Sequence, residues 1–160
     1  MDYNTRFFKQ YGAEQEQNCL IVLAPDHSVI FVGYGTDDLG GYRWRKDYNH
    51  TPTVAEIRAD VESLINERVA KTIREGMTYE GDPVWLSEEN QLNFRSAPST
   101  PVRFKLGEDA NGHPVYRTFT SKTELNNFNK AVADYIAACL NEGWNEKDSI
   151  DYSVYEEAAQ

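Results

Sequence analysis

The chain has 160 residues, carries a net charge of −10 and is 40% hydrophobic, 12% aromatic and 26% charged. This length fits one domain or a small module with an extension, and the composition excludes an intrinsically disordered chain. The acidic charge repels a phosphate backbone, and no apolar run approaches the roughly 20 residues that cross a bilayer, so we expect neither nucleic acid nor a membrane as a partner. Residues 1–17 are polar and contain no signal peptide, which predicts synthesis in a reducing cytoplasm.

The first 18 residues predict a short helix or an arm that docks on a partner. They are polar apart from three aromatic side chains, which are Phe7, Phe8 and Tyr11. Exposed aromatic side chains outside a core mark partner interfaces more often than catalytic centres. We therefore assign partner binding to these three residues.

Two apolar runs follow, at residues 19–23 and 29–32, with a turn signal at Pro25-Asp26 between them. This pattern predicts a hairpin whose strands are largely buried. The next segment, residues 33–41 (GYGTDDLGG), lacks the lysine and the spacing of a phosphate-binding loop. We interpret it as a flexible linker.

Residues 42–48 (YRWRKDY) alternate aromatic and charged side chains, which predicts an exposed or edge strand. Basic side chains interleaved with aromatic ones are also typical of a platform on which nucleic-acid bases stack. Three cations in an acidic chain more often form local ion pairs, so we interpret the strand as a surface for protein contacts. The residues assigned to partner binding here are Tyr42, Arg43, Trp44 and Arg45.

Residues 54–75 predict a long amphipathic helix. Thr53 and Glu56 form a capping box at its start, apolar residues recur at spacings of three and four, and Gly76 is placed to end it. The opposite face of the helix is charged and expected to be solvated.

The chain from residue 77 predicts a hairpin, a short helix and a second hairpin. The first hairpin turns at Gly81-Asp82, and Ser87 is a good N-cap for the short helix. The second hairpin pairs residues 102–106 with residues 115–119, which both alternate, through a turn signal at Asn111-Gly112. Trp85 alternates with apolar neighbours and is predicted to lie in the core.

A second long amphipathic helix is predicted to start at a capping box of Ser121 and Glu124 and to end at Gly143. After it, Trp144 and Ile150 are expected to fold back onto the core. Residues 153–160 are expected to fray.

These elements predict an α+β fold, in which small antiparallel hairpins pack with two long amphipathic helices and one short helix. We expect residues 1–41 to form an N-terminal arm, a hairpin and a glycine-rich linker. Residues 42–152 are then an α+β module with a compact core at 77–152, and residues 153–160 are its frayed tail.

No motif for chemistry is evident. The three histidines, His27, His50 and His113, fall in turns without ligands at metal-binding spacing, and no nucleophile motif is present. Two carboxylate pairs, Asp37 with Asp38 and Asp148 with Asp151, have the residue types of an acid/base pair, but such pairs arise by chance among 26 acidic residues. We predict no catalytic residue, no cofactor and no metal, and hence a protein that is not an enzyme.

The two cysteines, Cys19 and Cys139, both sit in apolar runs and are interpreted as small buried hydrophobic residues. A disulfide between them stays open.

Four segments carry a resemblance to a known group of proteins. They read GYRWRKDYNHTPTVAEI, VWLSEENQLNF, PVRFKLGED with PVYRTFTSKTEL, and EGWNEKDSIDY. On these segments the run from Tyr42 to Tyr152 resembles uncharacterised proteins encoded by phages and prophages of gut Bacteroidales. WLSEENQLNF and the ending EGW-x-x-KD-x-I are the more specific motifs, the first 40 residues carry no match, and SAPSTP is shorter than the corresponding stretch often is in that group.

The resemblance implies a virion component or an accessory protein, with no active-site residue to transfer. We expect a phage structural protein of a capsid, neck, tail or fibre, present in the virion and made in the cytoplasm of the bacterial host. Its partners would be other virion proteins and further copies of itself. The alternatives are a non-virion assembly factor, such as a tail-fibre chaperone, and an enzyme that acts on polysaccharide.

Overall fold

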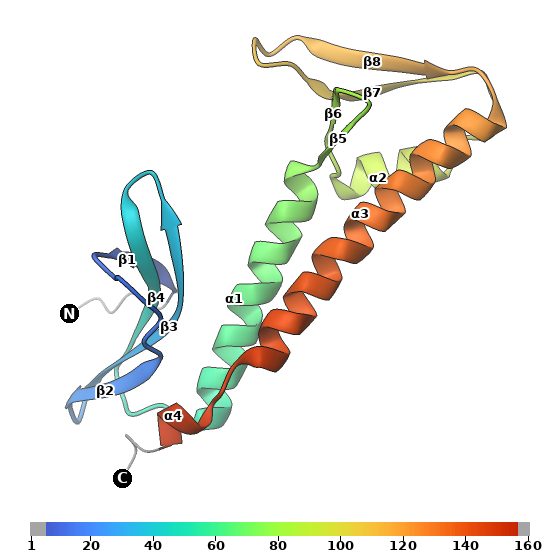
Figure 1. The fold of residues 1–160 in the computed structure, drawn as a ribbon. Coiled ribbons are helices and arrows are strands. Elements are labelled where there is room, and N and C mark those ends of the chain that lie inside the picture. Colours follow the sequence, from blue (N-terminus) through green and yellow to red (C-terminus); the bar gives the residue numbers. More distant parts are fainter. Residues whose placement is uncertain (1–5, 157–160) are drawn as a thin grey trace. The chain divides into compact units, whose positions relative to one another are not determined.

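The computed structural model describes residues 6–156 and confirms the predicted α+β class (Figure 1). The chain divides into two compact units. Unit 1 runs up to Leu64 and takes in the chain again from Ser149, and unit 2 is Ile65–Asp148. The division lies within two helices, α1 (Val54–Glu75) and α3 (Lys122–Ser149), and not at residue 42, where the sequence pattern changes.

Unit 1 contains a four-stranded antiparallel sheet in the order β1-β4-β3-β2. The strands are β1 (Phe8–Tyr11), β2 (Cys19–Ala24), β3 (His27–Asp37) and β4 (Gly40–Tyr48). Residues 8–11 are therefore neither a helix nor an arm that leaves the fold to dock on a partner, because they form β1 and pair with β4 of the same chain, and residues 1–5 lie outside the described part. For residues 42–48 the sequence predicts an exposed or edge strand. They are not an edge strand, because β4 has a strand on each side, and most of their side chains are half-buried.

The predicted linker at residues 33–41 is also wrong, because these residues extend β3 and β4 into a long hairpin. Its glycines serve the pairing of the two strands. Gly33 has a φ of +71° where the register shifts between Val32 and Gly35, a conformation that glycine adopts without strain. A Cβ at Gly35 would come within 2.6 Å of the Tyr42 ring, so a glycine there makes room for that aromatic side chain.

The core of unit 1 is formed by strands of the sheet, by the first turns of α1 and by the segment that ends in α4. Its buried apolar residues are Leu20, Val29, Ile30, Phe31, Val32, Tyr48, Ile57, Val61, Leu64, Tyr152 and Tyr155. Helix α4 (Ser153–Glu156) contacts β2 and buries Tyr155 completely. The Tyr155 hydroxyl donates a hydrogen bond of 2.8 Å to the Phe31 carbonyl, so the predicted fraying is wrong as far as residue 156, and residues 157–160 lie outside the described part.

The capping box of α1 is confirmed. The Thr53 backbone N–H donates to the Glu56 carboxylate at 2.8 Å, and the Glu56 backbone N–H donates to the Thr53 hydroxyl at 3.2 Å. Gly76, with a φ of +91°, ends the helix as expected.

Unit 2 contains two hairpins, as predicted, and the short helix α2 (Glu88–Arg95), which Ser87 caps. The hairpins are β5 (Met77–Tyr79) with β6 (Asp82–Val84), and β7 (Val102–Glu108) with β8 (Pro114–Phe119). They share one apolar cluster, whose buried members are Val84, Leu86, Phe94, Leu106, Phe119, Leu125, Phe128 and Val132. Phe128 is at its centre, with the rings of Phe94 and Phe119 at centroid distances of 5.1 and 4.8 Å.

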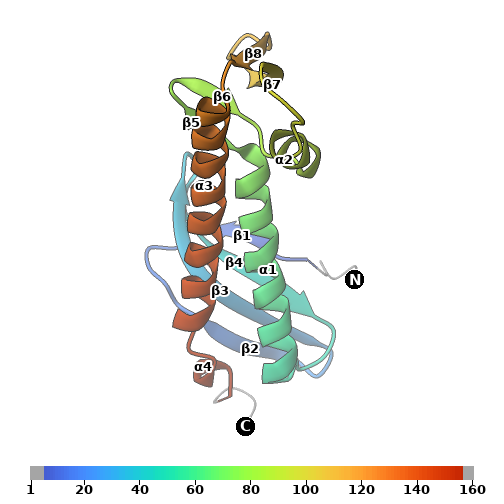
Figure 2. The same cartoon turned by 90° about the vertical axis from the view of Figure 1, so that its right-hand side faces the viewer.

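Helix α3 continues through Gly143 to Ser149, so the predicted end at Gly143 is wrong. Figure 2 shows α3 beside α1, and Gly143 is buried where the two helices meet in unit 2. A Cβ on Gly143 would lie 2.6 Å from Cγ2 of Val69. The glycine therefore allows close helix packing and does not cap the helix.

Both tryptophans assigned to the core are substantially exposed, Trp85 at 40% and Trp144 at 53%. Trp144 borders an apolar hollow of about 150 Å³ on unit 2, together with Val69, Ile73 and Leu140. The prediction of core packing is wrong for both residues, because α3 carries Trp144 outward and Trp85 lies just after strand β6.

Candidate functional site

The seven residues predicted to bind a partner are brought together by the pairing of β1 with β4. The register places Phe8 opposite Arg45, Lys9 opposite Trp44, Gln10 opposite Arg43 and Tyr11 opposite Tyr42. Phe7 lies directly before β1. Because residues directly opposite each other share a face, the pair presents two different surfaces.

One surface, the aromatic face, carries Lys9, Tyr11, Tyr42 and Trp44. The rings of Tyr11 and Tyr42 meet edge to face at 5.9 Å, as do the rings of Tyr42 and Trp44. Lys9 Nζ lies 4.1 Å from the centroid of the Tyr42 ring, within the range of a cation–π interaction. These contacts hold the three aromatic side chains in a row. Tyr11 is 40% exposed, whereas Tyr42 and Trp44 are half-buried.

Asp37 at the end of β3 fixes this row. Its carboxylate accepts hydrogen bonds from Lys9 Nζ at 2.8 Å and from the Tyr11 hydroxyl at 3.0 Å, and also from the Leu39 backbone N–H. The hydrogen bond from Lys9 is the main reason that the pKa of Asp37 is lowered, and the same bond raises the pKa of Lys9. Asp37 is thus an ionised anchor for β1 and does not have the environment of a general acid.

The opposite surface, the guanidinium face, carries Phe8, Gln10, Arg43 and Arg45. The Arg43 guanidinium lies 3.5 Å from the centroid of the ring of Phe31, a residue of β3 that is only 4% exposed. Arg45 donates two hydrogen bonds to Asp47, at 2.7 and 2.9 Å, and these bonds lower the pKa of that carboxyl. The prediction of local ion pairs among the basic residues is confirmed for Arg45, and Lys46 pairs likewise with Asp60 at 2.7 Å.

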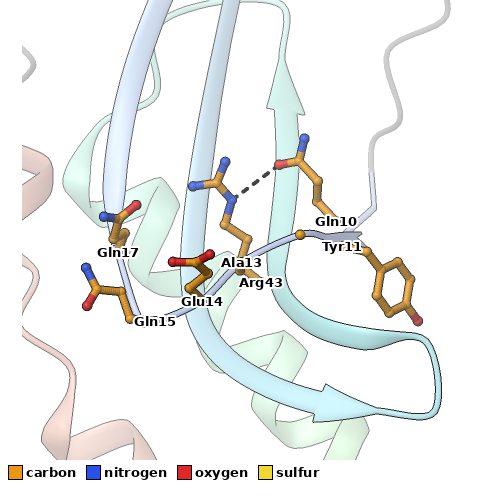
Figure 3. Close-up of a pocket in the computed structure, with 8 residues that line it drawn as sticks. Gln10, Tyr11, Ala13, Glu14, Gln15, Gln17 and Arg43 are labelled. Atoms are coloured by element: carbon orange, nitrogen blue, oxygen red, sulfur yellow. Dashed lines mark hydrogen bonds between the residues drawn. The ribbon is translucent and has the colours of Figure 1, made fainter.

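A polar hollow of about 310 Å³ adjoins the guanidinium face, at the connection between β1 and β2 (Figure 3). Gln10 accepts a hydrogen bond of 3.3 Å from Arg43 Nε in its wall, and Glu14, Gln15 and Gln17 supply further polar groups. The connection is anchored at each end, because Gly12 N–H donates to the Gly41 carbonyl at 2.9 Å and Asn18 accepts from the Gly33 N–H at 2.8 Å. The hollow offers amide, carboxylate and guanidinium groups for hydrogen bonding, and the Tyr11 ring points away from it in Figure 3.

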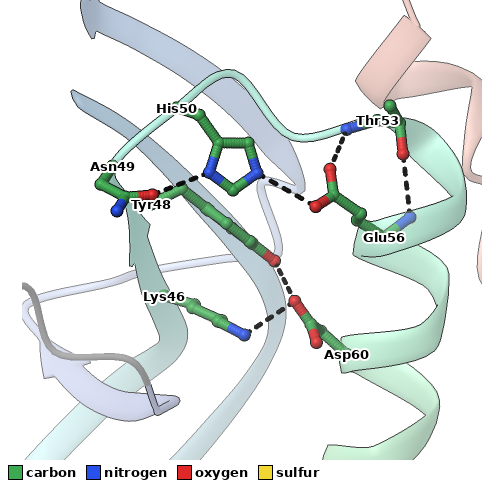
Figure 4. A network of polar contacts seen from close by, with 7 residues as sticks. All are labelled: Lys46, Tyr48, Asn49, His50, Thr53, Glu56 and Asp60. Carbon is green, nitrogen blue, oxygen red and sulfur yellow. Dashed lines mark hydrogen bonds and ion pairs between the residues drawn. The ribbon is translucent and has the colours of Figure 1, made fainter. Parts of the chain in front are cut away.

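A second polar group lies where β4 leads into α1, beside a hollow of about 390 Å³ (Figure 4). Asp60 accepts a hydrogen bond of 2.5 Å from the Tyr48 hydroxyl and one of 2.7 Å from Lys46. Burial is the main cause of the raised pKa of Tyr48, and the bond to Asp60 adds to it, so this hydroxyl stays protonated.

His50 completes this polar group by contacting Glu56 of the capping box at 3.0 Å. Each group in Figure 4 contacts another residue of this network, which spans the end of β4, the connection after it and the start of α1. The arrangement therefore fastens the first turns of α1 to β4 within unit 1.

The most exposed apolar strand of the sheet is β2, which the sequence predicted to be largely buried. Ile21, Val22 and Leu23 are 42%, 44% and 58% exposed, and only Leu20 within the strand is buried. Among the described residues β2 has a neighbouring strand on one side only, so it forms an edge of the sheet. Sequence reasoning missed this surface because an apolar run of that length has the same composition in a central strand and in an exposed edge strand.

The second carboxylate pair is divided between the units. Asp151 of unit 1 accepts hydrogen bonds from Ser153 at the start of α4, and Asp148 belongs to unit 2. Cys19 and Cys139 are both free, and burial raises the pKa of the Cys19 thiol. Within residues 6–156, no group of three or more His, Cys, Asp or Glu side chains is arranged to hold a metal ion.

None of the helices in the described part of the chain has the length and apolar character needed to span a membrane. Comparisons with protein-family models, with curated proteins and with solved structures found no match to this chain.

Proposed function

We propose that this protein is a structural subunit of a bacteriophage virion, which acts through protein–protein contacts and has no enzymatic activity. The observation that carries the contact function is β2, an uncharged edge strand on which three consecutive apolar side chains are exposed. An edge strand can pair with a strand of another chain through its backbone hydrogen bonds. The partner then also covers the exposed apolar side chains and removes them from water.

The neighbouring strands support the same function. Edge-to-face ring contacts, cation–π contacts and ion pairs fix β1 and β4, so the sheet is a rigid frame that presents β2. A pre-organised surface loses little conformational freedom when a partner binds. The viral context rests on the sequence resemblance of residues 42–152.

The test is quantitative mass spectrometry of purified particles of the phage or induced prophage that encodes the chain. We expect the protein at a fixed ratio to the major capsid protein that does not change through repeated density-gradient purification. An abundant protein of the host cytoplasm, followed in the same fractions, reports contamination. Loss of the protein in step with that host marker would overturn the virion assignment and favour an assembly factor.

A further inference from the structure

We infer that β2 is the dimer contact of this protein and that it pairs antiparallel with β2 of a second copy. This inference rests on the proposed function, in which β2 is a surface for protein contacts, and it names a second copy of the chain as the partner of that surface. The two sheets would join across the two β2 strands into one continuous antiparallel sheet.

The two edges of the sheet differ in how they are protected. The edge strand β1 carries Lys9 in its middle and is four residues long, and a short, charged strand is a common way to discourage pairing. The edge strand β2 has six residues, CLIVLA, with no charge and no proline. Its register shifts between Val22 and Ala24, so the stretch from Cys19 to Val22 is regularly paired with β3. No strand of the described chain pairs with the other side of β2, and although α4 contacts this strand, Ile21, Val22 and Leu23 stay 42%, 44% and 58% exposed.

Self-pairing suits this strand because it is uncharged along its length in a chain of net charge −10. A second copy places no carboxylate opposite another within the six residues, and like charges directly opposite each other would be unfavourable. Successive side chains alternate between the two faces, so Ile21 and Val22 lie on opposite faces of the sheet. A neighbouring strand covers both of them at once, on both copies.

The symmetry of the contact also favours a second copy. Two identical strands that pair antiparallel about a two-fold axis form a closed dimer, in which neither β2 edge is left exposed. Pairing of β2 with β1 of another copy would leave one edge free at each end and build an open chain. The two-fold axis stands perpendicular to the joined sheet, so a side chain on one face in one copy lies on the same face in the other copy. Residues directly opposite each other share a face, so the axis must pass beside one residue that lies opposite its own copy. We place this residue at Ile21 or Val22, near the middle of β2.

The primary measurement is the mass of the natural chain by sedimentation velocity over a range of concentrations. We expect a species of twice the 18.3 kDa chain mass that dissociates on dilution. Lysine at whichever of Ile21 and Val22 pairs with its own copy puts two like charges directly opposite each other, and lysine at the other residue puts a charge into the apolar contact. We expect Ile21→Lys and Val22→Lys each to weaken the dimer about tenfold or more. The matched control is Leu39→Lys, which adds the same charge at a residue that is 76% exposed between β3 and β4 and should leave the dimer intact.

The strand register is read by cysteine cross-linking in a Cys19→Ser/Cys139→Ser background. Oxidation should join two copies of Ile21→Cys if the axis passes through that residue, or two copies of Val22→Cys if it passes through that one, because directly opposite residues lie within disulfide reach. This measurement does not depend on the stability of the lysine variants. Leu39→Cys is the control that should not cross-link.

A natural chain that stays monomeric at every concentration would overturn the dimer, and so would a dimer that the β2 lysines weaken no more than Leu39→Lys does. A monomer found in virions would contradict this inference alone and point to a strand from another virion protein. A β2 dimer that is missing from virions would contradict the proposed function alone.

Discussion

Two tyrosines near the end of the described chain are both buried, but their hydroxyl groups have different surroundings. Tyr155 donates a hydrogen bond of 2.8 Å to the Phe31 carbonyl, whereas the buried Tyr152 hydroxyl has no hydrogen-bond partner among the described residues. Burial raises the pKa of both side chains, so both are neutral at ordinary pH. The pair therefore separates the effect of a hydrogen bond from the effect of a buried ring.

We expect Tyr155→Phe to lower the free energy of unfolding by about 1–2 kcal/mol, because it removes a buried hydrogen bond and leaves a carbonyl without this donor. Chemical denaturation measures the loss. Tyr152→Phe is the matched control, and it should be neutral or slightly stabilising because it removes a hydroxyl that makes no bond. Equal losses for the two variants would contradict the role given to the Tyr155 hydroxyl.

The start of helix α1 joins a capping box to a histidine. Glu56 accepts from the Thr53 backbone N–H at 2.8 Å and contacts His50 at 3.0 Å, and the bond from Thr53 is the main cause of its lowered pKa. A carboxyl whose pKa is lowered by folding stabilises the protein above its ordinary pKa of 4.5. That contribution is lost as the pH falls through the lowered value.

We expect Glu56→Gln to lower the free energy of unfolding by about 0.5–1 kcal/mol at pH 7, where the carboxylate also favours the helix N-terminus. The difference from the natural chain should shrink as the pH falls from 4.5 through the lowered pKa of Glu56, because below that pKa both side chains are neutral. Denaturant titrations at several pH values measure it. Glu67→Gln, at an exposed position in the middle of the same helix, should show no comparable pH dependence.

The packing of α1 against α3 in unit 2 depends on Gly143. A Cβ there would lie 2.6 Å from Cγ2 of Val69, a branched side chain that moves little, so Gly143→Ala overpacks the contact. We expect the substitution to destabilise the natural chain by about 1 kcal/mol, net of the better helix propensity of alanine. In a Val69→Ala background the same substitution should stabilise by up to about 1 kcal/mol, because only the propensity effect is left.

Thermal or chemical denaturation of the four chains completes this double-mutant cycle. Independent effects of the two substitutions would rule out a direct contact between Gly143 and Val69.

Each of the two units has its own buried side chains, which predicts that they open separately. Phe128 is at the centre of the aromatic cluster in unit 2, and Ile30 is fully buried in the sheet of unit 1. We expect Phe128→Leu, at a cost of roughly 1–2 kcal/mol, to speed hydrogen exchange mainly in α2 and the β5–β8 hairpins. Ile30→Val, at about 0.5–1.5 kcal/mol, should act mainly on β2, β3 and β4. If either substitution accelerated all protected amides equally, the chain would unfold as one cooperative unit.

Local patterns in the sequence determined much of the molecule. The capping residues Thr53, Ser87 and Ser121, the period of the two long helices and the alternation of the unit 2 hairpins all depend on neighbours within a few residues. Because such neighbours are close in the sequence, their pattern can be recognised there, and the α+β class follows from these patterns. The aromatic and basic residues of β1 and β4 could likewise be singled out, because their alternation is local.

Only the tertiary structure decided what lies next to each strand and helix. An apolar run such as β2 and a glycine such as Gly35 or Gly143 look alike in exposed and buried settings, since their surroundings come from residues far along the chain. Pairing with β1 made β4 a central strand, contact with Val69 let α3 run through Gly143, and the position of β2 at the end of the sheet left Ile21 to Leu23 exposed. Burial is a property of the assembled fold, and the sequence by itself determined the elements but not their neighbours.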